Sequence, residues 1–174
     1  GECGYDVPRR IMSQPRIKTG LGLDAHAFAE NRTLILGGVL IPYERGLMGH
    51  SDADVLCHAI SDALLGAAGL GDIGQHFPDT DPIYFGASSI MLMQCCAEKV
   101  RQTGYAVGNV DAVVIAQEPK IGPHTEHMTH HIAQALGIEP AQVNIKATTT
   151  EHMGFTGRKE GIAAQAVCLL ERID

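Results

Sequence analysis

The alternation of apolar and polar residues predicts strands and helices interspersed along one chain. Residues 17–23 alternate apolar and polar side chains, which is typical of a strand, and this strand is expected to run into Asp24-Ala25-His26. Residues 33–42 predict two short strands around a Gly-Gly turn. Three further β runs are expected over residues 107–116, 143–148 and 163–171.

Apolar residues at helical spacing predict three helices. The first is expected to begin in Gly49-His50-Ser51-Asp52, with Ser51 or Asp52 as its N-cap, and to end in Gly69-Leu70-Gly71. The second covers residues 88–103, and the third covers residues 124–136 and is closed by Gly137. The Asp- and Pro-rich segment 72–86, the segment from Pro119 to Pro123 and the segment 154–161 are expected to be loops.

This order of elements predicts an α+β domain with one mixed sheet that is covered on one face by helices. Residues 16–174 form that domain, and residues 1–15, which lack a clear period, are interpreted as an N-terminal extension, a linker or a tag remnant. A chain of 174 residues buries roughly 70% of its unfolded surface, so it needs no disulfide or metal to fold. Because aromatic residues make up only 5% and Trp is absent, the core is expected to be aliphatic.

Charge and cysteine content narrow the possible functions. The net charge of −7 argues against a nucleic-acid surface but permits a phosphorylated ligand whose charge a metal neutralises. No apolar run reaches the length of a membrane span and no export signal opens the sequence, so we expect a cytoplasmic protein. The five Cys are odd in number and form no CxxC motif, and four of them are expected to be buried free thiols that suit a reducing compartment: Cys57, Cys95, Cys96 and Cys168.

Asp24 and His26 are candidate metal ligands. Residues i and i+2 of a strand point to the same face, so one carboxylate and one imidazole converge, and His58 follows in the first helix. Two His and one Asp leave the fourth position of a tetrahedral zinc open, which is the pattern of a catalytic site. The alternative is a strand-end Asp that caps a neighbouring group, with His58 half-buried on its helix.

The segment from His50 to Asp54 joins a loop to a helix N-terminus, where free N–H groups favour an anion. His50 and Ser51 would add side-chain donors, although a plain capping box with exposed acids explains the same residues. Asp54 stands four residues before His58, so it either orients a metal-bound His58 or forms a helix-surface pair with it.

Three other segments carry candidate chemistry. Lys146 to Glu151 would place three Thr hydroxyls on a loop, with Glu151 as an oxygen ligand for Mg²⁺, or else it is an edge strand. The acidic loop from Asp72 to Asp81 either holds ligand hydroxyls or is solvated. Four His between positions 124 and 131 are interpreted as an exposed helix face: His124, His127, His130 and His131.

Taken in order, these motifs resemble the family of 2-C-methyl-D-erythritol 2,4-cyclodiphosphate synthases over about residues 16–172. The motifs that carry the resemblance are Asp24-x-His26, His50-Ser51-Asp52-x-Asp54-x-x-x-His58, the run from Asp72 to Asp81, Gln117-x-Pro119-Lys120 and Lys146 to Glu151 followed by Gly154-Phe155-Thr156-Gly157-Arg158. The resemblance implies a homotrimer whose sheets face a three-fold axis, with active sites shared between adjacent subunits. It also implies a metal-dependent phosphorus–oxygen lyase of non-mevalonate isoprenoid biosynthesis. The 2-phosphate of 4-diphosphocytidyl-2-C-methyl-D-erythritol 2-phosphate attacks the β-phosphorus, and CMP leaves.

The resemblance also implies roles for individual residues. It implies that Asp24, His26 and His58 bind Zn²⁺, that Glu151 binds a second ion, Mg²⁺ or Mn²⁺, and that His50 and Thr149 are catalytic. Substrate-binding roles fall on Asp24, His26, His50 and Ser51; on Asp72, Ile73, Gly74, Phe77, Pro78, Asp79, Thr80 and Asp81 for the ribose and methylerythritol; on Ala116, Gln117, Glu118, Pro119, Lys120, Ile121 and Gly122 for the cytidine; and on Thr148, Thr149, Thr150, Glu151, Phe155 and Arg158 for the phosphates.

Some residues depart from the family pattern, and two other functions are open. Gly122 stands where larger apolar residues are common, and Gln165 stands where some members carry Glu in the central cavity, which affects any isoprenoid diphosphate bound there. The first alternative is a zinc hydrolase of a nucleotide diphosphate, with His50 or Asp54 as the base. The second is a trimeric isoprenoid-binding protein without turnover. Incorporation of water separates the hydrolase from the cyclase.

Overall fold

The computed structural model describes residues 14–174, and five strands form its main sheet in the order β4-β1-β7-β5-β6. The strands are β1 (Ile17–Ala29), β4 (Gly46–Leu47), β5 (Tyr105–Ile115), β6 (Val143–Thr148) and β7 (Gly161–Arg172). β7 pairs antiparallel with both β1 and β5, whereas β5 and β6 are parallel, so the sheet is mixed as expected. A separate hairpin joins β2 (Leu34–Leu36) to β3 (Val39–Ile41) through the predicted Gly-Gly turn.

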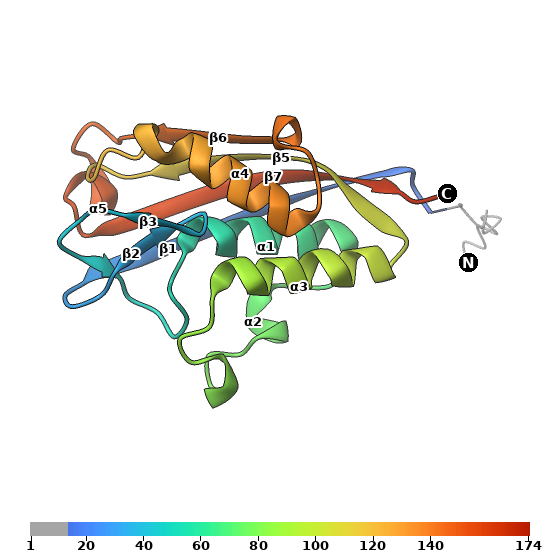
Figure 1. The fold of residues 1–174 in the computed structure, drawn as a ribbon, viewed down its shortest axis with the longest axis horizontal. Coiled ribbons are helices and arrows are strands. Elements are labelled where there is room, and N and C mark those ends of the chain that lie inside the picture. The colour runs from blue at the N-terminus through green and yellow to red at the C-terminus, as the bar shows by residue number, and fades with distance from the viewer. Residues whose placement is uncertain (1–13) are drawn as a thin grey trace, which may run out of the picture.

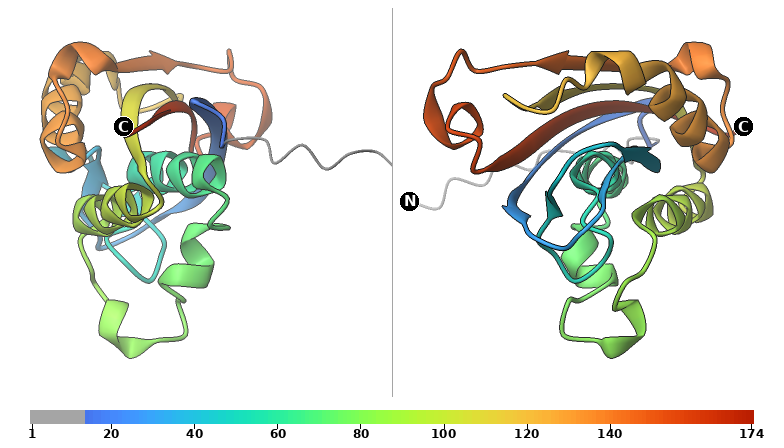
Figure 2. Two further views of the ribbon diagram at one scale, coloured as in Figure 1. Left: turned by 90° about the vertical axis from the view of Figure 1, so that its right-hand side faces the viewer. Right: turned by 60° about the vertical axis from the view of Figure 1, so that its left-hand side comes forward.

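Three long helices cover one face of this sheet (Figures 1 and 2). They are α1 (Val55–Ala68), α3 (Ser89–Gln102) and α4 (Thr125–Leu136). α1 packs on β1 and β7 and lies beside α3, while α4 packs on β6. The core between the layers is aliphatic, as the composition predicted, and includes Leu56, Ile60 and Leu64 of α1, Met128 and Ile132 of α4, and Val110, Ala112 and Val114 of β5. The α+β class with helices on one face of a mixed sheet is therefore confirmed.

Short helical turns interrupt segments that the sequence predicted to be loops. α2 (Ile73–His76) and a 3₁₀ turn (Pro82–Tyr84) lie in the Asp- and Pro-rich segment, because Asp72 and Asp81 each cap the turn that follows. α5 (Gly154–Gly157) lies in the later Gly-rich segment. Two further 3₁₀ turns, Gly122–His124 and Pro140–Gln142, lead into α4 and β6. A single turn can be stabilised by one hydrogen bond from a backbone N–H to a capping side chain. The Asp, Pro and Gly content of a segment does not reveal such a bond.

The opposite face of the sheet is exposed and carries both apolar side chains and polar ones, among them Asp111, Lys146 and Gln165. Leu21 and Leu23 of β1 are 61% and 64% exposed, and Val167 of β7 is 47% exposed. Side chains alternate between the two faces of a strand, so Gly20, Gly22, Asp24 and His26 all face the helices. The interpretation of residues 1–15 falls mostly outside the described residues, although the Gln14 and Pro15 carbonyls accept hydrogen bonds from Arg172 and Tyr105.

Candidate metal and substrate site

Glycines on β1 bring α1 into direct contact with the sheet beside Asp24 and His26. A Cβ atom at either Gly20 or Gly22 would lie 1.9 Å from a carbonyl oxygen of α1, that of Ala63 or Ala59 respectively. Only glycine therefore allows this separation between strand and helix. Asp24 and His26 continue the same face of β1, where they meet the first turn of α1.

The first turn of α1 is fixed by Asp54, which is the N-cap in place of the expected Ser51 or Asp52. Its buried carboxylate accepts hydrogen bonds from the backbone N–H groups of Gly37 (2.9 Å), Gly38 (2.7 Å) and Cys57 (3.1 Å). Asp54 is thus neither an orienting partner of His58 nor part of an exposed pair, because its oxygens are used by the β2–β3 turn and by the helix. Burial raises the pKa of this carboxyl, and the backbone donors oppose that rise.

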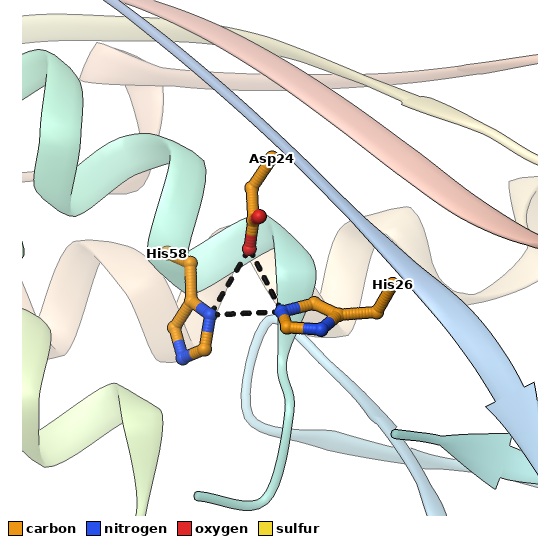
Figure 3. Close-up of side chains that lie close together, drawn as sticks. All are labelled: Asp24, His26 and His58. Atoms are coloured by element: carbon orange, nitrogen blue, oxygen red, sulfur yellow. Dashed lines mark hydrogen bonds and ion pairs between the residues drawn. The ribbon is translucent and has the colours of Figure 1, made fainter. Parts of the chain in front are cut away.

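The three candidate ligands meet at one point (Figure 3). Asp24 Oδ2 lies 2.9 Å from His26 Nε2 and 3.0 Å from His58 Nδ1, and the two imidazole nitrogens are 3.1 Å apart. Ligands about 2.0–2.1 Å from a tetrahedral zinc stand roughly 3.3 Å from one another, so this triangle is close to the size that zinc requires. It is the one such cluster of His, Cys, Asp and Glu within residues 14–174.

The charges of this triad suit a divalent cation. Burial by itself raises the pKa of Asp24, but hydrogen bonds to His26 and His58 and their charges hold it well below its usual range. Burial by itself lowers the pKa of His26, yet the hydrogen bond and charge of Asp24 and a hydrogen bond with the Met48 backbone raise it. The carboxylate is therefore ionised, and a tetrahedral zinc held by these three residues would have one further position for another ligand.

A cavity of about 360 Å³ opens beside the triad. His26 and His58 lie in its wall together with other predicted site residues: His50, Ser51, Ile73, Gly74, Phe77, Pro78 and Asp79. Gly49, Tyr84 and Leu92 complete the lining, and none of the three was among the predicted site residues. No sequence motif marks these residues as part of a site. Tyr84 joins the cavity wall because its ring packs edge-on against that of Phe77.

The segment that carries His50 and Ser51 is held from two sides. The Arg32 guanidinium donates to the carbonyl oxygens of Gly49 (2.7 Å) and Ser51 (2.6 Å). On the other side, Gly86 N–H donates to the His50 carbonyl at 2.9 Å. Arg32 thereby fixes the backbone that carries the His50 and Ser51 side chains. The sequence did not predict this role, because Arg32 lies far from both residues along the chain and belongs to none of the motifs.

A second cavity, of about 290 Å³, is lined by residues of the predicted cytidine segment and of the predicted phosphate loop. Its lining is Ala116, Gln117, Pro119, Lys120, Ile121, Gly122, Pro123, Ala147, Thr148 and Thr149. It shares no residue with the cavity beside the triad. The predicted site residues that line a cavity therefore fall into two separate groups within this chain.

Several predicted site residues line neither cavity: Asp24, Asp72, Thr80, Asp81, Glu118, Thr150, Glu151, Phe155 and Arg158. Asp72 and Asp81 cap helical turns, and the Asp81 carbonyl lies 3.2 Å from His50 Nε2. Glu118 and Arg158 form ion pairs with Lys159 and Glu160 on the surface. Glu151 is exposed, and its Oε1 lies 3.3 Å from the Thr149 hydroxyl, which places both on the rim of the second cavity.

Two other predictions about chemistry have clear outcomes. Three His of the α4 stripe are exposed and His124 is half-buried, and none belongs to a metal cluster among the described residues. Cys57, Cys96 and Cys168 are buried free thiols as predicted, but Cys95 is exposed because its side chain points away from the core.

Within residues 14–174, no helix has the length and apolarity to cross a membrane.

Comparison with known proteins connects these observations to one family. The YgbB family model matches residues 17–171. The 2-C-methyl-D-erythritol 2,4-cyclodiphosphate synthase of Thiobacillus denitrificans is 61% identical over 156 residues, which cover 90% of this chain and 98% of the relative.

Solved structures agree with this match. The bifunctional IspDF of Campylobacter jejuni superposes with a TM-score of 0.88 at 47% identity, over 91% of this chain but only 43% of that longer protein. The CDP complex of IspF from Plasmodium falciparum has a TM-score of 0.80 at 34% identity and is matched over 93% of this chain and 100% of its own. This chain therefore belongs to the YgbB family, the family of the 2-C-methyl-D-erythritol 2,4-cyclodiphosphate synthases.

Proposed function

We propose that this protein converts 4-diphosphocytidyl-2-C-methyl-D-erythritol 2-phosphate into 2-C-methyl-D-erythritol 2,4-cyclodiphosphate and CMP. An oxygen of the substrate's own 2-phosphate forms a bond to the β-phosphorus of the diphosphate. The bond from that phosphorus to the bridging oxygen breaks, and the oxygen leaves with CMP. No water is consumed, so the two products together contain every atom of the substrate.

The observation that carries this proposal is that two residues of the triad, His26 and His58, line a cavity that also presents His50 and Ser51. The ligand atoms of Asp24, His26 and His58 lie 2.9–3.1 Å from one another. The membership of the family adds the identity of the reaction. A divalent cation held by the triad, next to hydrogen-bond donors on His50 and Ser51, would supply the positive charge that a phosphate requires.

The residues present suit a reaction whose nucleophile belongs to the substrate. Burial raises the pKa of Cys96 and of Cys168 to about 11, so these thiols stay protonated and inert. The protein must instead fold a polyanion back on itself, and correct positioning of two reacting groups is worth up to about 7–11 kcal/mol. We assign His50 and Ser51 to the phosphates near the triad, and the Thr149 hydroxyl to the diphosphate.

The proposal includes two divalent ions. Zn²⁺ would be held by Asp24, His26 and His58, and Mg²⁺ or Mn²⁺ by Glu151. When bound, such ions neutralise phosphate charge and polarise phosphoryl oxygens. The triad fits zinc because its donors are two imidazoles and a carboxylate at suitable separations. Glu151 offers the hard oxygen that Mg²⁺ prefers.

We further propose a homotrimer with active sites at subunit interfaces. Leu21, Leu23 and Val167 expose apolar surface of the kind that another subunit covers. The separation of the two cavities supports the same conclusion, because each holds only half of the predicted contacts. The segment from Asp72 to Asp81 would then contact ribose and methylerythritol, and the segment from Ala116 to Gly122 of a neighbour would contact cytidine, with Phe155 and Arg158 near the phosphates and the three-fold axis.

The central axis and the compartment belong to the same proposal. Gln165 lies on the open face of the sheet, near Asp111 and Lys146. We propose that an isoprenoid diphosphate binds along the axis there. Buried free thiols at Cys57, Cys96 and Cys168 support a cytoplasmic location.

The test is release of CMP from the authentic substrate by the zinc-loaded protein, with mass spectrometry of the second product. We expect a product whose mass equals that of the substrate minus CMP. In H₂¹⁸O, no ¹⁸O should enter the product. Addition of water would instead identify a hydrolase, although Asp54 is unavailable as its base because the carboxylate is buried and bonded to backbone N–H groups. Diphosphate binding without turnover would identify a binding protein.

A further inference from the structure

The second nitrogen of His58 has partners that the proposed reaction does not explain. His58 Nδ1 belongs to the triad, while Nε2 points away from it and lies 2.9 Å from the Ser89 hydroxyl oxygen. An imidazole that binds a metal through Nδ1 carries its proton on Nε2. That N–H group is half-buried, so it requires an acceptor on the protein.

Ser89 is prepared to be this acceptor by Asp52. The Ser89 hydroxyl donates a hydrogen bond to Asp52 Oδ1, and the Ser89 backbone N–H donates to Asp52 Oδ2 at 3.1 Å. Because a carboxylate can only accept, the serine proton points to Asp52 and the oxygen lone pairs remain available to His58. Ser89 is fully buried at the start of α3, where the N-cap residue Ser88 forms no side-chain cap of its own.

Ser51 is the other hydroxyl near His58, at 3.2 Å from Nε2. It also accepts from the Ala53 backbone N–H at 3.1 Å, and it lines the cavity beside the triad. Ser89 does not line that cavity. Ser51 therefore lines the substrate space, whereas Ser89 lies behind His58 and links it to Asp52. The Ser89 hydroxyl oxygen also lies 3.2 Å from the Ser51 hydroxyl oxygen, and Asp52 Oδ1 also accepts from the Asp54 backbone N–H at 3.2 Å.

We propose that Asp52 and Ser89 are positioning residues for the metal, which set the proton of His58 on Nε2 and aim its Nδ1 at the ion. The inference rests on the metal site of the proposed function, not on the reaction. Partners behind a metal-bound histidine raise its basicity and fix its orientation, and their loss typically lowers metal affinity roughly 10- to 100-fold. Asp52 acts through Ser89, so the two substitutions should not be additive.

The experiment measures zinc dissociation constants of the full chain by competition with a chromogenic chelator, without substrate. We expect Ser89→Ala to weaken zinc binding roughly 10- to 100-fold. The matched control is Ser61→Ala, since Ser61 is also fully buried and donates to the Cys57 carbonyl at 2.8 Å without touching His58. This control should keep the wild-type zinc affinity even where its melting temperature falls.

Asp52→Asn gives the second arm. Its amide group can donate to the Ser89 hydroxyl and turn the serine proton toward His58, so it should also weaken zinc binding. Adding it to Ser89→Ala should weaken binding no further. If Ser89→Ala does not fold, Asp52→Asn alone decides, and wild-type affinity in the folded variant overturns the proposal.

Two other results would also overturn it: a zinc affinity of Ser89→Ala within threefold of wild type, or equal losses in Ser89→Ala and Ser61→Ala. Failure of the proposed function has a different signature. If the zinc affinity depends on Ser89 as expected but the wild-type protein releases no CMP, the cyclase proposal is wrong and this inference stands. Wild-type protein that binds no zinc would remove the metal site itself.

Discussion

Gly22 of β1 and Ala59 of α1 touch through their backbones, with no space for a side chain between them. A Cβ atom at position 22 would lie 1.9 Å from the Ala59 carbonyl oxygen. This contact sets the distance between the strand that carries Asp24 and His26 and the helix that carries His58. The metal triad thus depends on a residue that contributes no functional group.

Gly22→Ala is expected to lower both stability and zinc affinity, because α1 must move away from β1. Overpacking of this kind costs about 1–3 kcal/mol, to be measured by urea unfolding of the zinc-free protein. Gly66→Ala is the matched control in the same helix, since nothing lies within 4 Å of its added methyl group. It should raise stability by about 0.5–1 kcal/mol. Equal zinc affinity in Gly22→Ala and wild type would contradict the dependence of the triad on this contact.

His58→Ala is expected to abolish CMP release and to lower bound zinc, because three protein ligands become two. Mass spectrometry measures the bound zinc, and circular dichroism measures whether the fold is retained. The fold should persist, since the core around Leu56, Ile60 and Leu64 is aliphatic. Chelation of wild-type protein should reproduce the loss, and added zinc should reverse it. His127→Ala, an exposed histidine on α4, should change neither quantity. Full activity of zinc-depleted His58→Ala would remove zinc from the mechanism.

Glu151→Gln is expected to spare zinc and to raise the Mg²⁺ or Mn²⁺ concentration needed for half-maximal CMP release. The amide keeps the size of the side chain but loses the charge that a hard cation requires. Glu126→Gln on α4 removes an equivalent exposed charge and should leave the metal titration unchanged. Superimposable titrations for Glu151→Gln and wild type would show that this carboxylate is not a ligand.

Mixing two inactive proteins tests the shared site. One carries His58→Ala, and the other carries Thr149→Ala with Glu151→Gln in the second half-site. In a random one-to-one trimer, roughly a quarter of interfaces pair two intact halves, so about that share of wild-type activity should return. Native mass spectrometry must first verify subunit exchange. A verified mixture without activity, or an active monomer, would place the whole site within one chain.

The order and type of the long elements could be predicted from the sequence, because apolar periodicity directly reports which face is buried. Residues 17–23, 88–103 and 143–148 gave β1, α3 and β6 within a few residues. One part of the triad was predictable for a similar reason, since alternate residues on a strand share a face and Asp24 and His26 therefore lie on the same side of β1. That His58 joins them depends on the packing of α1 against β1. The family was predictable from the order of its motifs.

Helix starts and short turns were less predictable, because several residues in a row can cap a helix. Ser51 or Asp52 was the expected N-cap of α1, but the N-cap is Asp54, whose carboxylate also accepts from the distant Gly37 and Gly38 N–H groups. Asp52 was then free to bond to Ser89, another distant residue.

Local features can be derived from the sequence alone: the periodicity of the long elements and the types of candidate ligands. The partners that meet across long separations follow only from the packing of the elements, as in Arg32 with Gly49, His58 with Ser89, and Gly22 with Ala59. The physical reason is that hydrogen bonds and close contacts act over a few ångströms in space, regardless of how far apart the partners lie in the chain. Local patterns therefore specify each element, while the packing of elements specifies the site.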